Sequence, residues 1–240
     1  MNIVITGAGG VLCSAFSRAL AADGHKIALL DLNLEAAERE AEGIRKAGGK
    51  AIAVQANVLD KESLKKAHDI VLEKFGPCEV LINGAGGNNP KGTTTSEYFS
   101  KEDMLDENAR SFFDLDQGGV SFVFNLNFLG TLLTTQAFAA DMLETGGCIV
   151  NISSMNAFTP LTKIPAYSGA KAAVSNFTQW LAVHFANCNI RVNAIAPGFF
   201  ATNQNRTLLF NEDGSLTPRS HKIISQRSDE RRVGKECLAW

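Results

Sequence analysis

The chain has 240 residues, 45% of them hydrophobic, and carries 23 basic against 25 acidic residues for a formal net charge of -2. This length and composition predict a globular protein with a sizeable core, and one domain is the default expectation. Without an excess of positive charge, neither a nucleic-acid partner nor binding to an anionic membrane surface is predicted. No apolar run approaches the roughly 20 residues that cross a bilayer, so a membrane protein is also excluded.

The amino-terminal segment and the cysteines indicate a cytoplasmic protein. The first apolar run ends at Thr6-Gly7, which is too short for the core of a signal peptide, and no cationic segment precedes it. The cysteines are odd in number, form no CxxC pair and mostly lie in apolar runs, as buried thiols of a reducing compartment do. They predict neither a disulfide framework nor a metal site. The five are Cys13, Cys78, Cys148, Cys188 and Cys237.

Short apolar runs alternate with longer amphipathic stretches, a pattern typical of βαβ units. The runs predicted as strands are residues 2–5, 26–30, 51–55, 80–83, 147–152 and 190–195. Apolar residues at helical spacing predict helices over 11–23, 34–47, 61–75, 120–144 and 166–186. Right-handed crossovers then give an α/β fold, a doubly wound parallel sheet of the Rossmann type in a single domain. Such a sheet binds its ligand at the carboxyl ends of its strands.

Residues 88–119 interrupt this alternation with a polar insertion between the fourth predicted strand and the next predicted helix. Loops of this length are usually functional or disordered. Because the insertion follows a strand end, it is expected to rim the ligand cleft. We therefore interpret it as a substrate-side element, and a merely solvated loop is the alternative.

A glycine-rich turn, Thr6 to Gly10, directly follows the first predicted strand. Glycines there let the backbone approach a pyrophosphate, which the amino terminus of the following helix can hold. Asp31 ends the second predicted strand, 21 residues beyond Gly10, where a carboxylate can accept hydrogen bonds from both ribose hydroxyls. No arginine or lysine stands beside it to accommodate a 2′-phosphate, so the sequence predicts NAD in preference to NADP.

Three polar residues near the fifth predicted strand could support hydride transfer to a carbonyl. Ser154 follows the strand end, Tyr167 lies 13 residues further on, and Lys171 lies one helical turn beyond Tyr167. A tyrosine pKa of about 10 is too high for proton exchange near neutrality unless a cation favours the phenolate, and Lys171 is predicted to supply that charge. The Ser154 hydroxyl can hold the substrate oxygen. An exposed helix face is the alternative for Tyr167 and Lys171 taken alone.

With these motifs the chain resembles the short-chain dehydrogenase/reductase family over residues 1 to about 226. The matching segments are Thr6 to Gly10, Asn83 to Gly86, Asn127, Ser154, Tyr167 to Lys171 and Arg191 to Gly198. The resemblance implies that Tyr167 is the general acid/base, that Lys171 also binds the nicotinamide ribose and that Ser154 orients the carbonyl. It also implies that Asn127 kinks its helix and orders a proton-relay water near the lysine.

The resemblance implies NAD as the cofactor. Asn57 and Val58 would flank the adenine ring, while Pro197, Gly198 and Thr202 would hold the nicotinamide carboxamide. The complete implied set is Thr6, Gly7, Gly10, Leu12, Asp31, Asn57, Val58, Asn83, Ala85, Gly86, Tyr167, Lys171, Pro197, Gly198 and Thr202.

Three positions depart from the family's pattern. Cys13 replaces the third glycine of the dinucleotide fingerprint, and we expect the thiol to be tolerated as a packing residue; a reactive thiol at the helix amino terminus is the alternative. The family usually has asparagine where this chain has Gly84, and more often aspartate where it has Asn57. An amide can also hydrogen-bond adenine, so the change at Asn57 is expected to matter little.

The insertion resembles a subgroup described as D-mannonate oxidoreductases, or fructuronate reductases, in Asn88 to Lys91, Phe112 to Leu115 and Phe124 to Thr131. The implied reaction interconverts a secondary alcohol and a ketone on a sugar acid. Such a substrate needs many hydrogen bonds and one cation. The predicted substrate-binding residues are Asn88, Lys91, Ser154 and Arg206. A 3-oxoacyl-carrier reductase and a non-catalytic NAD-responsive regulator are the alternative functions.

Residues 227–240 do not match the family. From Arg227 to Cys237 the sequence resembles the in-frame translation of a sequencing adapter, so we expect a non-native tail; a solvated charged helix is the alternative. Within the predicted NAD-binding domain, residues 1–226, a substrate lid is expected over 199–226. The family's last strand is not found in the sequence, so an exposed sheet edge is predicted. The intact natural protein is expected to be a homo-oligomer.

Overall fold

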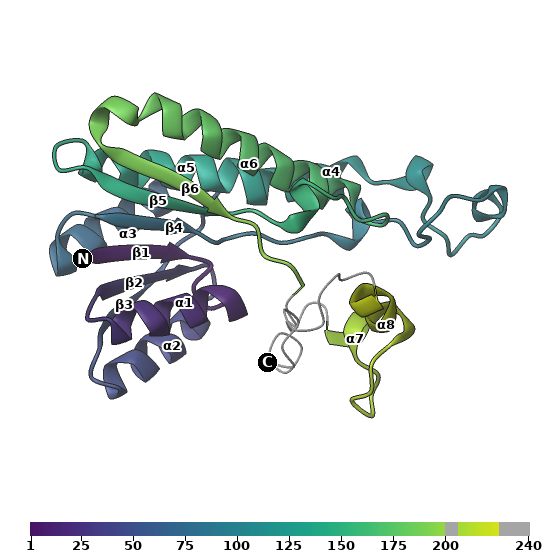
Figure 1. The fold of residues 1–240 in the computed structure, drawn as a ribbon, viewed down its shortest axis with the longest axis horizontal. Coiled ribbons are helices and arrows are strands. Elements are labelled where there is room, and N and C mark those ends of the chain that lie inside the picture. Colours follow the sequence, from purple (N-terminus) through teal and green to yellow (C-terminus); the bar gives the residue numbers. More distant parts are fainter. Residues whose placement is uncertain (200–205, 226–240) are drawn as a thin grey trace. The chain divides into compact units, whose positions relative to one another are not determined.

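The structure is a computed structural model that describes residues 1–199 and 206–225 (Figure 1). The chain divides into two compact units, residues 1–196 and 197–240. The first contains the whole sheet and the candidate catalytic residues. Within the described part of the second, Arg206–Leu209 (α7) and Pro218–Ser225 (α8) are helical, and the hydroxyl of Ser220 donates to the carbonyl of Leu209 at 2.5 Å.

The first unit is built on one parallel sheet in the order β3-β2-β1-β4-β5-β6. This order reverses direction between β1 and β4, which is the point where doubly wound sheets bind nucleotides. The predicted fold class is confirmed, and every predicted strand lies within one residue of its observed bounds. The strands are Asn2–Thr6 (β1), Lys26–Asp31 (β2), Lys50–Gln55 (β3), Val80–Asn83 (β4), Gly147–Ile152 (β5) and Ile190–Ile195 (β6).

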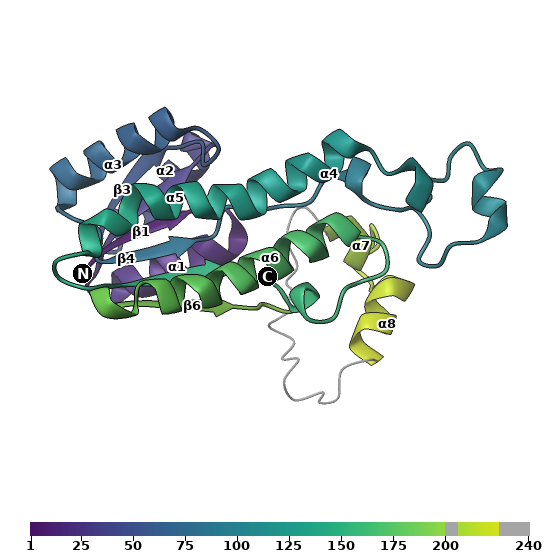
Figure 2. The same cartoon turned by 90° about the horizontal axis from the view of Figure 1, so that it is seen from above.

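Helices cover both faces of the sheet, as Figures 1 and 2 show from two directions. One core lies between the strands and α1 and α2, and a second lies between the strands and α3, α5 and α6. Burial on both faces explains why the strands read as nearly continuous apolar runs rather than as alternating ones. The helices are Val11–Ala22 (α1), Leu34–Lys46 (α2), Lys61–Phe75 (α3), Gly130–Phe138 (α5) and Pro165–His184 (α6).

Local signals in the sequence fix the ends of these helices. The Asn33 side chain accepts from the backbone N–H of Ala36 and so caps α2, and the Asp60 carboxylate caps α3 in the same way. Gly76 ends α3 with φ = 91°, a conformation that residues with a Cβ rarely adopt. The predicted helix over 61–75 therefore has its observed bounds.

The predicted helix over 120–144 differs from the structure. Gln117–Phe124 (α4) leads into a π-helical turn, Asn125–Leu129 (η4), before α5 begins. Within this turn the Asn127 amide donates to the carbonyl of Val123 at 2.8 Å. A side chain that inserts into the helical hydrogen-bond ladder locally expands it. The structure therefore has a π-helical turn at the residue where the family resemblance implies a kink.

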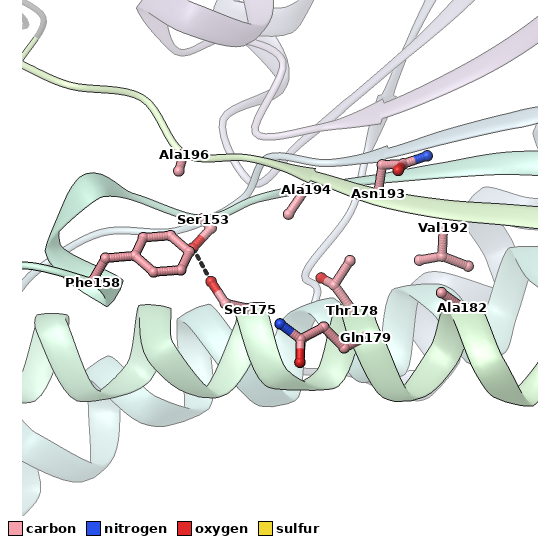
Figure 3. Close-up of a pocket in the computed structure, with 10 residues that line it drawn as sticks. All are labelled: Ser153, Phe158, Ser175, Thr178, Gln179, Ala182, Val192, Asn193, Ala194 and Ala196. Atoms are coloured by element: carbon pink, nitrogen blue, oxygen red, sulfur yellow. Dashed lines mark hydrogen bonds between the residues drawn. The ribbon is translucent and has the colours of Figure 1, made fainter.

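Among the described residues, β6 is the last strand of the sheet, as predicted. β6 and α6 line the groove in Figure 3, where the hydroxyls of Ser153 and Ser175 hydrogen-bond to each other at 2.6 Å. Asn193 and Ala194 line the β6 side of this groove and are exposed. Within 1–199 and 206–225, no helix combines the length and the apolar character that a membrane span requires.

Candidate active site

The glycine turn after β1 is held against the loop that follows β4. The Thr6 hydroxyl accepts from the backbone N–H groups of Gly84 at 3.1 Å and Ala85 at 3.2 Å. Gly7 has φ = 65°, and a Cβ there would lie 2.9 Å from the Ala85 backbone nitrogen. Only glycine fits this position, because both its conformation and its surroundings exclude a side chain.

The amino terminus of α1 can hold an anion. Gly10 begins the helix without a side-chain cap, and the first turn contains no acidic residue. The unpaired N–H groups and the helix dipole are therefore available to a phosphate. This cradle fits the predicted dinucleotide on structural grounds alone.

Asp31 lies at the end of β2 beside this turn. Its two carboxylate oxygens accept from the backbone N–H groups of Gly9 and Asn33, each at 2.9 Å. A Cβ at Gly9 would lie 3.2 Å from the Asp31 carboxylate, so the close approach also requires glycine. Among the described residues, no lysine or arginine forms an ion pair with Asp31. This environment favours an unphosphorylated ribose.

Replacing Asp31 with alanine is expected to weaken NADH binding by about tenfold to a hundredfold, because hydrogen bonds to a charged group typically contribute roughly 1.5 to 3 kcal/mol. NADPH binding should change much less, since Asp31 would repel its 2′-phosphate. Fluorescence titration with both cofactors measures this, with Asp23→Ala at the far end of α1 as the control. A native preference for NADPH would contradict the assignment.

The loop after β4 also contacts the catalytic side of the cleft. The Gly87 N–H donates to the Asn127 amide oxygen at 3.2 Å, and the Asn127 amide nitrogen donates to the Gly87 carbonyl at 2.7 Å. A Cβ at Gly86 would lie 2.6 Å from the Asn127 amide oxygen and 3.2 Å from the Lys171 ammonium nitrogen. The backbone of residues 84–87 therefore separates the nucleotide turn from Asn127 and Lys171.

The structure brings Ser154, Tyr167 and Lys171 together. Ser154 follows β5, and its hydroxyl lies close enough to the Tyr167 phenol to oppose the rise in the phenol's pKa. Lys171 lies one turn further along α6, with its ammonium nitrogen 5.7 Å from the centre of the Tyr167 ring. That nitrogen donates to the carbonyl of Ile152 at 2.7 Å and is buried. A phenol, a hydroxyl and an ammonium thus lie near one another, and the ammonium faces the loop at Gly86 that adjoins the nucleotide turn.

Burial disfavours the charged form of both titratable groups in this site. It raises the pKa of Tyr167, and the Ser154 hydroxyl only partly opposes that rise. It also lowers the pKa of Lys171, to about 8. The phenol is therefore protonated at neutral pH, which suits donation of a proton to a carbonyl oxygen. That Lys171 favours the phenolate stays a prediction.

Several predicted cofactor residues use their side chains within the fold. The Asn83 amide donates to Thr135 at 3.0 Å and to Asn151 at 2.9 Å, and so joins β4 to β5 and α5. The Asn57 amide oxygen accepts from the Leu59 N–H at 3.0 Å, and Val58 packs in a small apolar cluster. Their contacts with a cofactor stay predictions.

The sequence reasoning did not identify Asn151 and Thr178, which belong to the same hydrogen-bond network as Asn83. Asn151 is buried and donates to Thr178 on α6 at 2.9 Å, which extends the network from Asn83 across the sheet. Its only signal was an amide within an otherwise apolar strand. The network holds the carboxyl ends of β4 and β5 in register beneath the candidate site.

The base of the insertion adjoins the catalytic helix. A Cβ at Gly92 would lie 3.4 Å from the methyl group of Ala166, the residue before Tyr167. Nearby, the Asn88 amide donates to Thr93 at 3.1 Å, and the Lys91 side chain is exposed. Figures 1 and 2 both show the middle of the insertion extending away from the sheet beyond α4. The expectation that the insertion rims the cleft stays a prediction.

Leu12 lies in α1 and packs against the core, and four further predicted residues belong to the second unit. Pro197 and Gly198 follow β6, and Thr202 lies outside the described residues. Arg206 begins α7 and places its guanidinium carbon 5.7 Å from the centre of the Phe210 ring. The roles of these four residues stay predictions, as do the lid over 199–226 and the tail over 227–240.

A family model described as short chain dehydrogenase matches residues 1–213. The chain therefore belongs to the short-chain dehydrogenase/reductase family, which confirms the resemblance found in the sequence. An uncharacterized oxidoreductase of Haemophilus influenzae is 59% identical over 224 residues, 93% of this chain and 78% of the relative. The uncharacterized oxidoreductase UxuB of Bacillus subtilis is 50% identical over 223 residues, 92% of this chain and 79% of the relative.

A crystal structure from Haemophilus influenzae is similar throughout the matched region. That protein is provisionally named a D-mannonate oxidoreductase and has NAD bound. It is 59% identical, with a TM-score of 0.89, and the match covers 93% of this chain and 80% of the other. This protein is therefore similar to the chain in both fold and sequence.

Proposed function

We propose that this chain is an NAD(H)-dependent oxidoreductase that interconverts D-mannonate and D-fructuronate, or a closely related pair of sugar acids. One observation carries the proposal. Ser154, Tyr167 and Lys171 lie near one another, beside a glycine turn whose Gly9 donates to Asp31. The NAD bound to the similar Haemophilus influenzae protein, and that protein's name, support the cofactor and the substrate class.

We propose a role for each candidate catalytic residue. NADH, when bound, supplies the hydride. Tyr167 donates its proton to the carbonyl oxygen during reduction and takes it back during oxidation. Ser154 holds that oxygen through its hydroxyl and stabilises its developing negative charge. Lys171 binds the nicotinamide ribose.

Asn127 positions the loop that faces the lysine. Its amide is bonded in both directions to Gly87, so the side chain cannot rotate without breaking the contact between η4 and residues 84–87. We propose that this fixed amide orders the water that returns protons toward Lys171. The cradle residues Thr6, Gly7 and Gly10 bind the pyrophosphate, and Asp31 binds the ribose of the adenosine.

The sugar-acid substrate is proposed from the polarity of the cleft margin. Asn88 and Lys91 lie at the base of the insertion, which contacts the start of α6 through Gly92 and Ala166. A polyol carboxylate would use both an amide and a cation, whereas an acyl chain would need an apolar surface. Asn88 and Lys91 are therefore the substrate contacts proposed from the first unit.

Parallel assays of NADH oxidation with D-fructuronate, D-tagaturonate and an acetoacetyl thioester test this proposal. D-Fructuronate is expected to have the highest kcat/KM. If the thioester were the best substrate, the chain would be a 3-oxoacyl-carrier reductase. If no carbonyl were reduced while NADH bound normally, the regulatory alternative would replace the catalytic one.

Neutralising the residue that pairs with the substrate carboxylate should raise KM for D-fructuronate by about tenfold to a hundredfold, since a charge-assisted hydrogen bond contributes roughly 1.5 to 3 kcal/mol. The variants are Lys91→Met and Arg206→Met, with Lys66→Met on the exposed face of α3 as the matched control. An uncharged ketose should be affected much less. The sugar-acid proposal fails if both variants leave the D-fructuronate kinetics unchanged.

We also propose a cytoplasmic location and a homo-oligomeric native protein. The described cysteines Cys13, Cys78, Cys148 and Cys188 all carry free thiols, which supports a reducing compartment. Trp180 and Val183 on α6 are 55% and 79% exposed, and large apolar side chains grouped on one helix favour association. Light scattering on the natural protein measures its oligomeric state.

A further inference from the structure

Two departures from the family's pattern meet in space. A Cβ at Gly84 would lie 2.1 Å from the Cys13 sulfur but 3.7 Å from the Cys13 Cβ. The sulfur therefore occupies the volume that a side chain at residue 84 would need. Cys13 is on α1, directly after the nucleotide turn, and is 3% exposed.

The contact reaches the candidate catalytic residues through a short stretch of backbone. Cys13 supports one side of the loop at Gly84, and the other side of the loop faces Lys171 and Asn127 at Gly86. The N–H groups of Gly84 and Gly87 donate to the Thr6 hydroxyl and to the Asn127 amide oxygen, and these bonds hold the two ends of the stretch. A side chain at residue 84 must displace the Cys13 sulfur, α1 or the loop, because protein interiors are closely packed.

Chemistry of the thiol is not required for this role. Burial raises the pKa of Cys13 to about 12, so the group stays neutral in the physiological range. A neutral thiol acts here as a compact apolar group of defined size. The alternative of a reactive Cys13 would need a depressed pKa, and the shift has the opposite direction.

We propose that Cys13 is a positioning residue whose sulfur supports the backbone at Gly84 and thereby sets the placement of residues 84–87 against Lys171 and Asn127. Residues 13 and 84 share one space between helix and loop. The Cys13 side chain fills this space, and Gly84 has no side chain. Of the expected results, only the pH dependence rests on the proposed contact between Lys171 and the cofactor.

A double-mutant cycle in the full chain tests the pair, with NADH affinity measured by fluorescence. Gly84→Ala is expected to weaken binding by about tenfold to a hundredfold, because the new methyl group overlaps the sulfur. In a Cys13→Ala background the loss of NADH affinity caused by the same substitution should be at least about fivefold smaller. The rescue should be partial, since the methyl group would still lie 2.8 Å from the Thr6 carbonyl oxygen.

The pH dependence of NADH binding separates positioning from simple destabilisation. The native chain should show an inflection near the Lys171 pKa of about 8. Gly84→Ala should displace it, and Cys13→Ala/Gly84→Ala should bring it back toward the native value. Gly147→Ala is the matched control, because its Cβ would lie 2.5 Å from the Met142 sulfur at the opposite end of the sheet. It should lower the melting temperature and leave the inflection in place.

The single variants at Cys13 keep the test decisive if Gly84→Ala does not fold. Cys13→Ala should weaken NADH binding by a few-fold and displace the inflection, whereas the nearly isosteric Cys13→Ser should keep both close to native. Equal effects of Gly84→Ala with cysteine or alanine at residue 13, or a native inflection in Cys13→Ala, would overturn the proposal. A native chain without any inflection would instead refute the contact between Lys171 and the cofactor, and the affinity cycle would still decide on the pair.

Discussion

Tyr167→Phe is expected to lower kcat for carbonyl reduction by about 10² to 10⁴-fold, the usual contribution of a general acid. The dissociation constant for NADH should stay close to the native value, because the ring and its packing against Val123, Ala166 and Ala170 remain. Only the hydroxyl of the phenol, which faces Ser154, is lost. Steady-state kinetics and fluorescence titration on the same preparation measure both quantities.

The chain provides its own control for this substitution. Tyr98 is the other of the two tyrosines. It lies in the insertion and is 74% exposed. Tyr98→Phe should retain native kcat. A Tyr167→Phe variant with near-native kcat would refute the proposed proton donor, whereas one that no longer bound NADH would indicate a structural role for the phenol.

Lys171→Met should abolish turnover and at the same time stabilise the protein by about 2 kcal/mol at pH 7 without cofactor. Burial lowers the Lys171 pKa from 10.5 to about 8, and a shift of that size corresponds to about 3 kcal/mol. Loss of the hydrogen bond to Ile152 offsets roughly 1 kcal/mol of the gain. The catalytic lysine thus costs stability, as functional groups in buried sites commonly do.

The sign of the pH dependence distinguishes this explanation from a packing effect. Below pH 8 the lysine is charged in both the folded and the unfolded chain, so the full cost of its burial is present. Between pH 8 and 10.5 the folded chain releases the proton first, and the cost is lost as the pH rises through this range. The stabilisation by Lys171→Met should therefore shrink between these two values.

Urea unfolding of the native chain and the variant at pH 7 and pH 10 measures this change, with Lys66→Met as the exposed control. A variant that is less stable than the native chain at pH 7 would contradict the account. A gain that is equally large at both pH values would indicate improved packing rather than removal of a buried charge.

The sheet could be predicted from the sequence because its signals are local. Each strand is an apolar run of four to six residues, and polar or glycine residues bound it in the sequence. Both faces are covered, so no alternation was needed to assign them. The starts of α2 and α3 coincide with the capping side chains of Asn33 and Asp60.

The π-helical turn at Asn125–Leu129 was less accessible. Its cause is the Asn127 amide, which bonds both to Val123 in its own helix and to Gly87 in a loop distant in sequence. Apolar periodicity alone therefore suggested one unbroken helix. Only the family resemblance pointed to a kink at this residue.

The candidate site was predicted to the same mixed degree. Helical spacing placed Tyr167 and Lys171 on one face, and the strand end placed Ser154 nearby. The raised pKa of Tyr167 could not be foreseen, because it depends on burial by residues from other elements. The contact between Cys13 and Gly84 is a property of packing between a helix and a loop, and no local pattern encodes it.

Transfer of deuterium from NADH labelled at the reactive carbon tests the central claim, hydride transfer at this site, most directly. D-Fructuronate that the native chain reduces in ordinary water is expected to gain a single deuterium at the new alcohol carbon, detected by mass spectrometry and NMR. With Tyr167→Phe the same labelled product should form at a rate lower by about 10² to 10⁴-fold. A product without deuterium at that carbon, or no product while labelled NADH binds with native affinity, would contradict it.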